Sequence, residues 1–411
     1  MNPLRLTLLA GAALAAAVPA GSYLPALASA IGAAPQEAAA APPAAQAKPA
    51  DVKKAASEAI DRGLKYLRSR QDVPTGTWMM EGRPEAGITG LALAAFLKSP
   101  RGYTAADGPF ISKPIDWIAS LSKEDGSIFD GQVANYVTAA SVLALKESGD
   151  PRFAPLIAKA QKYLLTSQSD ESEGYTPDNK FYGGAGYGSD ERPDMSNMNF
   201  WMDALQATGL PKEDEAYKKA LVFLNRCQNH SESNKSEWKD VKTGETFVPG
   251  NDGGATYMPG SSFAGAITLP DGRKVARSYG SMTYALLKCY LIAGLPKDDP
   301  RVKAAVEWIG KNFTVDENPG FDLSKDPEAN MQGLFYYYLT MAKALDQYGE
   351  KTIVDGSGRK REWAAELAAK IVSLQKPDGS WVGIKSRWWE NVPELATSYS
   401  VLALEHCLPH L

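Results

Sequence analysis

Residues 375–381 read Gln-Lys-Pro-Asp-Gly-Ser-Trp and lie between two segments of helical character. A related stretch runs from Gln71 to Trp78 and ends in Gly-Thr-Trp. A weaker one runs from Lys123 to Phe129, with phenylalanine for tryptophan and no glutamine. The glutamine side chain can bond the backbone at a helix end while the tryptophan stacks on it, which would tie one unit to the next. The recurrence predicts a fold made of repeats.

From Ser57 onward, the chain around these stretches shows one pattern six times: a charged amphipathic helix, a loop rich in Gly or Pro, and a more apolar helix. We expect the first helices at Glu58–Arg70, Lys113–Ser122, Leu156–Ser167, Glu215–Gln228, Pro300–Asn312 and Glu362–Leu374. We expect the second helices at Gly87–Leu97, Tyr136–Ser148, Ser196–Thr208, Tyr279–Ala293, Met331–Gln347 and Leu395–His406. The cap residues at the expected helix ends support these bounds. They are Asp194 and Asp299 at helix starts and Gly149, Gly209, Gly294 and Gly349 just past the second helices.

The two kinds of helix differ in how apolar residues are distributed around them. The first helices have one apolar face and one charged face, whereas the second helices are apolar nearly all round and should be buried on both sides. This difference predicts an all-α fold of two concentric layers, an (α/α)6 barrel with the second helices as its inner ring. An open solenoid is the alternative, but it would leave a polar concave face in solvent. Alternating sequence suffices for no more than a hairpin or two.

Two connections between first and second helices are long. They span residues 169–194 and 229–278 and are rich in Gly, Asn, Ser and Asp. All such connections lie at one end of a barrel, and long loops in a compact domain are often functional. We therefore expect the site at that end, over the mouth of the central cavity.

The first fifty residues differ from the rest. A short basic start, an apolar run from Leu6 to Val18 and the small residues Ala28-Ser29-Ala30 predict a secretory signal peptide over residues 1–30. An uncleaved anchor is the competing interpretation. Residues 31–50, rich in Ala and Pro, predict a linker, and residues 51–411 a single toroid domain. We expect an exported protein, periplasmic or extracellular, with no integral membrane segment after cleavage, because no later stretch reaches about 18 apolar residues.

The overall composition narrows the possible functions. The 411 residues include 44 Lys and Arg, 48 Asp and Glu, 3 Cys and 3 His, for a net charge of −4. The charge gives no basic footprint for nucleic acid, and three cysteines cannot form a disulfide scaffold of this size. The sequence has no P-loop, dinucleotide fingerprint, G-x-S-x-G or H-E-x-x-H motif. We expect no cofactor and no metal, and the three cysteines are interpreted as small buried hydrophobes.

The glutamine and Gly-x-Trp stretches resemble the repeats of the squalene cyclase and protein prenyltransferase superfamily, the α/α toroids. The chain is also similar to a group of exported bacterial proteins with prenyltransferase and squalene-oxidase repeats. The shared segments are residues 192–197, 277–285, 316–320 and 378–390. The resemblance covers nearly all of residues 51–411 and implies a toroid fold and an isoprenoid or other hydrophobic ligand. The D-x-D-D acid of the cyclases and the Asp, Cys and His zinc ligands of the prenyltransferases are both missing, so neither mechanism carries over.

Two carboxylates at the predicted mouth are candidate catalytic residues. Asp194 begins an inner helix, and Asp190 belongs to the same acidic cluster. A carboxylate facing an apolar cavity has a raised pKa and can act as a general acid. The alternative role of Asp194 is an N-cap that accepts hydrogen bonds from Ser196 or Asn197.

Several polar and aromatic residues near the same end are candidate ligand-binding residues. A cation and phenols suit a polar head group, aromatic faces suit an apolar ligand or a cation, and adjacent exposed tryptophans suit a sugar or lipid. Core packing is the alternative for each. The candidates are Arg192, Asn197, Arg277, Tyr279, Tyr284, Tyr336, Trp388 and Trp389.

Three functions therefore stay open. The first is an exported toroid enzyme, an isomerase or transferase, or a binding protein for an isoprenoid or other hydrophobic molecule. The second is a non-catalytic binding or scaffold protein with the same fold. The third is a carbohydrate-active (α/α)6 lyase or hydrolase, which needs paired carboxylates or a Tyr and Arg site in a cleft.

Overall fold

The structure is a computed structural model, and it describes residues 49–188, 192–240 and 243–411. The predicted signal peptide lies outside the described residues. Of the predicted linker, only Pro49 and Ala50 are described, and they form the first two residues of a helix. The described residues fall in the unit Ala47–Leu411.

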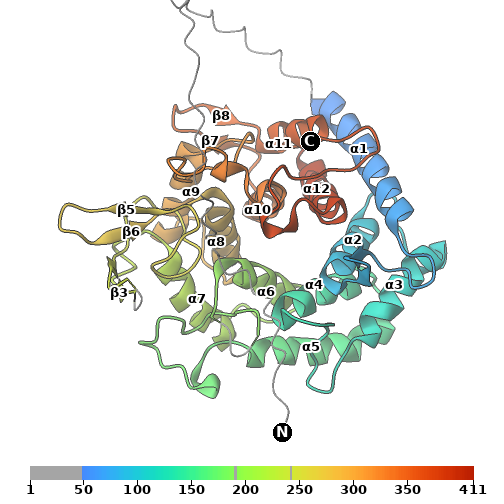
Figure 1. Cartoon of the computed structure of the whole chain (residues 1–411), viewed down its shortest axis with the longest axis horizontal. Coiled ribbons are helices and arrows are strands. Elements are labelled where there is room, and N and C mark those ends of the chain that lie inside the picture. Colours follow the sequence, from blue (N-terminus) through green and yellow to red (C-terminus); the bar gives the residue numbers. More distant parts are fainter. Residues whose placement is uncertain (1–48, 189–191, 241–242) are drawn as a thin grey trace, which may run out of the picture. The chain divides into compact units, whose positions relative to one another are not determined.

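The described residues form twelve α-helices that alternate between an outer and an inner layer (Figure 1). The outer helices are α1 (Pro49–Arg70), α3 (Pro109–Ser120), α5 (Ala154–Thr166), α7 (Glu215–Cys227), α9 (Pro300–Lys311) and α11 (Trp363–Ser373). The inner helices are α2 (Ala86–Lys98), α4 (Ala134–Glu147), α6 (Met195–Ala207), α8 (Gly280–Ile292), α10 (Leu334–Tyr348) and α12 (Pro393–Cys407). All twelve expected helices are present. Most of their ends agree within about three residues, which is near the ordinary uncertainty of helix bounds, but α1 begins nine residues before the predicted start at Glu58.

The inner helices pack in chain order around a centre. Each contacts the next, and α12 contacts α2, while α1 packs against α11 and α12 (Figure 1). The first and last helix pairs therefore meet, as a closed ring requires and an open solenoid does not.

The burial of the two layers follows the sequence pattern. In α8 every residue except Leu291 is buried, whereas α7 buries one stripe that includes Tyr217, Phe223 and Leu224. A helix enclosed on both sides has to be apolar all round, and one that faces solvent needs only a stripe. The core lies mainly between the two layers.

The glutamine of the opening motif joins the last repeat to the first. Gln375 Nε2 donates hydrogen bonds to the carbonyls of Gly379 (3.0 Å) and of Ala59 in α1 (2.9 Å). Trp381 Nε1 donates to the Ile371 carbonyl (2.7 Å). The predicted role of this motif, a bond from one repeat to the next, is therefore confirmed.

The same glutamine bond recurs at three other outer helices. Gln71, Gln168 and Gln228 donate to carbonyls of the following outer helices, at Phe110, Ala216 and Arg301 respectively. In the third repeat Trp201, from the inner helix, donates to the Leu164 carbonyl, four residues before its glutamine, as the motif tryptophan does elsewhere.

The second repeat requires a correction. Phe129 does not occupy the tryptophan position. Ile128 does: it is fully buried, and its backbone N–H donates to Thr138 Oγ1 as that of Trp381 donates to Thr397 Oγ1. Asp125 and Gly126 align with Asp378 and Gly379, so Ile128 aligns with Trp381 and is the side chain that points inward.

The motif glycine is needed because the turn touches the next repeat. Gly379 has φ of 91°, and a Cβ there would lie 2.5 Å from the Arg62 carbonyl oxygen of α1. Gly183 has φ of 82°, and its Cβ would lie 1.9 Å from the Lys219 carbonyl oxygen of α7. Any larger residue would hold the two repeats apart.

Three small sheets lie in the connections. Two are hairpins, β1 (Met79–Met80) with β2 (Arg83–Pro84) and β7 (Ile353–Val354) with β8 (Lys360–Arg361). The third lies in the 229–278 insertion, in the order β3 (Trp238–Lys239), β4 (Thr246–Phe247), β6 (Lys274–Ala276) and β5 (Ala266–Thr268). The β4–β6 pair is parallel and the others are antiparallel. This third sheet exceeds the expected hairpin or two, because strands this short leave no alternating pattern.

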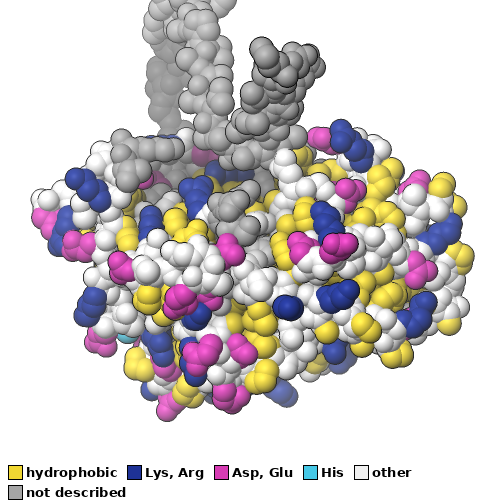
Figure 2. Space-filling view, turned by 90° about the horizontal axis from the view of Figure 1, so that it is seen from below, with side chains coloured by type: hydrophobic (Ala, Val, Ile, Leu, Met, Phe, Trp, Pro, Cys, Tyr) yellow, Lys and Arg dark blue, Asp and Glu magenta, His cyan; other side chains and the backbone are white. Residues whose placement is uncertain are grey.

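No helix in the described part of the chain is long and apolar enough to cross a membrane. The face seen in Figure 2 carries Lys and Arg side chains interspersed with Asp and Glu, without a large area of one sign.

Candidate functional site

Four aromatic rings from four inner helices meet inside the ring. The rings of Tyr136 (α4) and Phe200 (α6) have centroids 4.3 Å apart, and those of Tyr336 (α10) and Tyr399 (α12) are 6.0 Å apart. The hydroxyls of Tyr136 and Tyr399 lie 3.0 Å apart, and Asn199 Nδ2 donates to the Tyr336 hydroxyl (3.1 Å). All four residues lie in the N-terminal halves of their helices, so this aromatic layer is on that side of the ring.

A cavity of about 210 Å³ lies on one side of this layer, toward the C-terminal ends of the inner helices. Five of the six inner helices line it, and most of the lining is apolar. The lining residues are Leu91, Ala94, Lys98, Ala140, Leu143, Glu147, Phe200, Asp203, Gln206, Ala207, Leu339, Lys343, Leu402 and His406. Lys98, Glu147 and Gln206 are partly or fully exposed, so the cavity reaches solvent at this end.

A buried group of three charges forms part of the cavity wall. Asp203 lies between two ammonium groups, with Lys288 Nζ 2.5 Å from its Oδ1 and Lys343 Nζ hydrogen-bonded to its Oδ2. The side chains of Asp203 and Lys288 are 6% and 2% exposed. Burial disfavours the charged carboxylate, but the two lysines outweigh this effect and hold the pKa of Asp203 below its usual value. Burial lowers the pKa of Lys288 to about 8, although Asp203 opposes the shift.

Two histidines share one carboxylate beside this cavity. His406 Nδ1 lies 2.7 Å from Asp346 Oδ2, and His410 Nε2 lies 2.8 Å from Asp346 Oδ1. Burial lowers the pKa of His406 to about 4, so this imidazole is neutral at pH 7. The two imidazole bonds overcome burial and lower the pKa of Asp346 to about 2.

At the opposite end, the predicted catalytic Asp194 is a helix cap. Its Oδ1 accepts hydrogen bonds from the backbone N–H groups of Ser196 (2.8 Å) and Asn197 (2.9 Å), and its Oδ2 accepts from Asn197 Nδ2 (2.8 Å). The predicted N-cap is confirmed. Burial raises the pKa of Asp194, while these bonds oppose the rise. Asp194 does not line the cavity.

The predicted acidic cluster also includes the candidate residues Asp190 and Arg192. Asp190 lies outside the described residues, so its predicted catalytic role remains a prediction. Arg192 is exposed.

The inner-helix starts bring several predicted binding residues near Asp194. Tyr279 is the cap residue of α8, and its buried ring lies edge-on to Phe321 at 5.2 Å. Asp194 also raises the pKa of Tyr336, after the larger effect of burial. Tyr284 lies elsewhere, with its ring 5.7 Å from that of Tyr337 between α8 and α10. Arg277 is half-buried before α8.

The tryptophan pair lies above the mouth in a strained turn. Trp388 and Trp389 have φ of 64° and 63°, a region that costs non-glycine residues about 1–3 kcal/mol each. They are 38% and 48% exposed. Trp388 packs edge-on against Phe263 at 4.7 Å, and the Arg387 guanidinium lies 4.8 Å from the Trp388 ring.

Glu390, which follows this turn, was not predicted as a site residue. It is 1% exposed, and its Oε1 accepts a hydrogen bond from the Tyr336 backbone N–H (2.7 Å) at the start of α10. Its Oε2 has no partner among the described residues. Burial raises the pKa of Glu390 to about 8, although the helix N–H groups oppose the rise.

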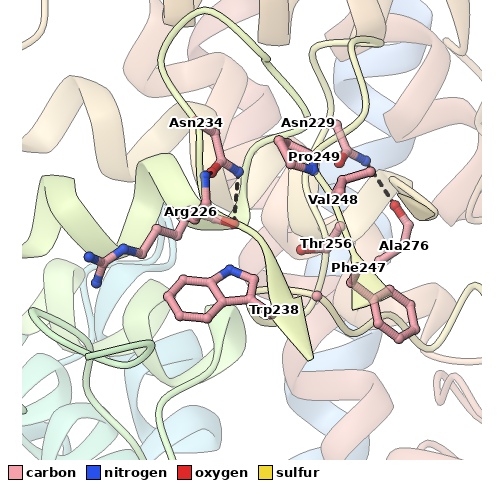
Figure 3. A pocket seen from close by; sticks show the side chains of 11 residues that line it. Arg226, Asn229, Asn234, Trp238, Phe247, Val248, Pro249, Thr256 and Ala276 are labelled. Atoms are coloured by element: carbon pink, nitrogen blue, oxygen red, sulfur yellow. Dashed lines mark hydrogen bonds between the residues drawn. The ribbon is translucent and has the colours of Figure 1, made fainter. Parts of the chain in front are cut away.

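A second cavity, inside the 229–278 insertion, is only about 10 Å³ and holds at most one water. Its polar wall is bonded internally: Asn234 Nδ2 donates to the Arg226 carbonyl (3.1 Å) and Asn229 Nδ2 to the Ala276 carbonyl (2.9 Å) (Figure 3). We interpret it as a packing defect of the insertion and not as a ligand site.

The described residues give little support for thiolate chemistry or for a metal site. Cys227, Cys289 and Cys407 are free and buried, and burial raises the pKa of each thiol. No group of three or more His, Cys, Asp or Glu within the described ranges could hold a metal ion.

The paired helix layers and the ring of inner helices give an all-α fold of the α/α toroid class. No family model matches the chain, and neither does any curated protein.

Solved structures provide the comparison. The chain is similar to a single-residue variant of the type II terpene cyclase MstE from Scytonema, with 13% identity, a TM-score of 0.52, and coverage of 89% of this chain and 100% of that one. Unsubstituted MstE gives 14% identity, a TM-score of 0.50, and coverage of 87% and 99%. A glycosidase matches with 13% identity over 89% and 100% of the chains, but its TM-score of 0.47 is too low to support the fold. At these identities the likeness to MstE shows the fold and not the activity.

Proposed function

We propose that this protein is a six-repeat (α/α)6 toroid that binds a small hydrophobic molecule, an isoprenoid or a similar amphiphile, in its luminal cavity. The observation that carries the proposal is the cavity of about 210 Å³, which is lined mainly by apolar side chains from five inner helices. An apolar pocket with a few polar groups at one end is the usual form of a small-molecule site.

The size of the cavity limits the ligand. An apolar cavity of about 150 Å³ holds benzene. A cavity of about 210 Å³ therefore suits a molecule somewhat larger than benzene, or the end of a longer chain. Phe200, which belongs to the aromatic layer, closes the inner end of the cavity.

We propose ligand binding and no catalytic step. The proposal therefore holds equally for a non-catalytic binding protein with this fold. For the carbohydrate-active alternative, no contact among the described residues specifically favours a lyase or hydrolase site in the cavity. A general-acid role for Asp194 or Asp190 stays a hypothesis, since the oxygens of Asp194 are engaged in capping α6.

Binding is tested with the full chain and two neutral probes, geraniol and octan-1-ol, by isothermal titration calorimetry. We expect both to bind, and the variant Leu143→Trp, which fills the cavity from α4, to weaken binding at least about tenfold by excluding the ligand. The matched control is Leu165→Trp, a half-buried leucine on outer helix α5. If neither probe binds the unsubstituted protein, or if both variants bind equally well, the proposal is wrong.

Export is also a proposal, based on residues 1–30. The test is N-terminal sequencing of protein recovered from the native host. We expect the mature chain to begin at Ile31, directly after Ala30. A chain that retains Met1 contradicts cleavage and favours the anchor.

A further inference from the structure

The charges in the inner wall of the cavity do not balance. Asp203 supplies one carboxylate to two ammonium groups, those of Lys288 and Lys343. Lys343 belongs to the lining and is 18% exposed, while Lys288 lies behind it and also donates to the Asn199 carbonyl (3.3 Å). An ammonium has three donors, and Lys343 uses one of them on Asp203. An ammonium group that shares its carboxylate with a second lysine therefore faces the cavity with free donors.

Among the described residues, the other acidic groups near the cavity are not paired with Lys343. Glu147 lies at the solvent rim, 3.9 Å from Lys98, so these two charges compensate each other. Glu405 is 6% exposed near Lys98, and neither of its oxygens has a hydrogen-bond partner among the described residues. Burial raises the pKa of Glu405 well above its usual value, which favours its uncharged form. Asp346 is negatively charged beside a neutral His406, but it does not line the cavity, and His406 and His410 engage its two oxygens.

We propose that the cavity selects ligands with an anionic head group, a carboxylate or a phosphate monoester, placed against Lys343 with its apolar body along Leu91, Leu339 and Leu402. This inference rests on the proposed function and names the ligand class for the same cavity.

Desolvation favours this choice of head group. Two like charges held in a wall of low polarity repel each other, and neither is fully solvated. An incoming anion supplies the missing counter-charge and accepts the free N–H groups in charge-assisted hydrogen bonds. A cationic head would add a third positive charge to this wall.

The test is a series of probes with the same chain: octan-1-ol, octanoate, octyl phosphate and octylammonium. Titration calorimetry on the full chain gives the four affinities. We expect octanoate or octyl phosphate to bind at least about tenfold more tightly than octan-1-ol, because charge-assisted hydrogen bonds are the stronger ones. The tighter of the two anions identifies the head group. Octylammonium should bind more weakly than the alcohol.

Substitutions locate the effect. Lys343→Met should reduce the preference for the anion over octan-1-ol to near one. Lys98→Met leaves Glu147 as an unpaired negative charge at the rim and should reduce the preference about threefold. Glu147→Gln should increase it. The matched control is Lys370→Met, a half-buried lysine of outer helix α11 paired with Asp316, which should change nothing.

The outcomes separate the two proposals. If octan-1-ol does not bind, the proposed function fails. If octan-1-ol binds and neither anion binds more tightly, or if octylammonium binds best, the cavity stands and the anionic head group is wrong. An unchanged preference in both Lys98→Met and Lys343→Met also overturns it.

Discussion

The two ends of the inner ring differ in how they use their polar residues. At the N-terminal end, long connections cover the mouth, and carboxylates such as Asp194 and Glu390 are buried as caps of inner helices. At the C-terminal end the connections are short, as at residues 148–153 and 208–214, and the cavity opens there beside Asp203 and Lys343. The long connections at the N-terminal end therefore hold the inner helices in place. The C-terminal end, with its short connections, contains the cavity and the two lysines that share Asp203.

The largest expected effect comes from the cavity end. Asp203→Asn removes the carboxylate from two ammonium groups and should lower the free energy of unfolding by about 3–5 kcal/mol at pH 7, because it leaves buried charges unpaired. Urea denaturation followed by circular dichroism measures this change.

The control for that prediction is Asp316→Asn, which breaks an exposed pair with Lys370 and should cost less than about 0.5 kcal/mol. A loss below about 1 kcal/mol in Asp203→Asn would show that water or a counter-ion already balances the lysines.

At the mouth, Asp194→Ala should cost about 2 kcal/mol, because it removes the cap of α6 and leaves buried N–H groups without acceptors. Asp214→Ala provides the comparison, since Asp214 caps outer helix α7 through the Ala216 N–H at a half-buried site and should cost about 1 kcal/mol. Equal losses would mean that burial adds nothing to the cap at the mouth.

The two ends should respond to pH in opposite directions. The pKa of Glu390 is raised to about 8, so the folded state holds a proton that the unfolded state releases above about pH 4.5. Stability should therefore fall as pH rises from about 4.5 to 8, by at most about 1.4 kcal/mol per pH unit. The pKa of Lys288 is lowered to about 8, so between about pH 8 and 10.5 the unfolded state holds the extra proton, and this group adds stability as pH rises.

Denaturation midpoints measured across this range, with Glu390→Gln and Lys288→Met beside the unsubstituted chain, check the signs. Glu390→Gln should flatten the fall below pH 8, and Lys288→Met the rise above it. A Glu390→Gln variant with the original slope would contradict the assignment to this carboxyl.

The smallest effect is expected at the tryptophan turn. Trp389→Gly relieves a positive φ at an exposed position and should change stability by less than about 1 kcal/mol. Octan-1-ol affinity should stay unchanged, because Trp389 does not line the cavity. A large loss of binding in this variant would place the ligand at the mouth and reverse the comparison between the ends.

Much of the fold could be predicted because its signals are local. The polarity of the two helix types and caps such as Asp194 depend on neighbouring residues. Two copies of the glutamine motif, at Gln168 and Gln228, are not recognisable in the sequence. Insertions separate these glutamines from their glycines, and alanines, Ala185 and Ala255, occupy the tryptophan position. In the third repeat, the indole bond to the outer-helix carbonyl comes from Trp201 in inner helix α6 and not from the connection. A motif read along the sequence does not show this replacement.

The cavity was harder to predict, because Asp203, Lys343 and His406 are far apart in sequence and share no motif. One signal was present. Asp203, Lys288 and Glu405 lie in helices predicted to be buried, and a charged residue in a buried helix must be paired or neutral. Charges in the inner helices were a better guide to the luminal cavity than residues in the long loops.

The bond from Gln375 to the Ala59 carbonyl has a consequence for how the molecule comes apart. In an open array of repeats the end units fray first, and unfolding can proceed stepwise. Here α1 packs against α11 and α12 across about 300 residues of chain, so no repeat is terminal. Opening this seam exposes two repeats at once and releases a loop as long as the body, which favours a single cooperative transition.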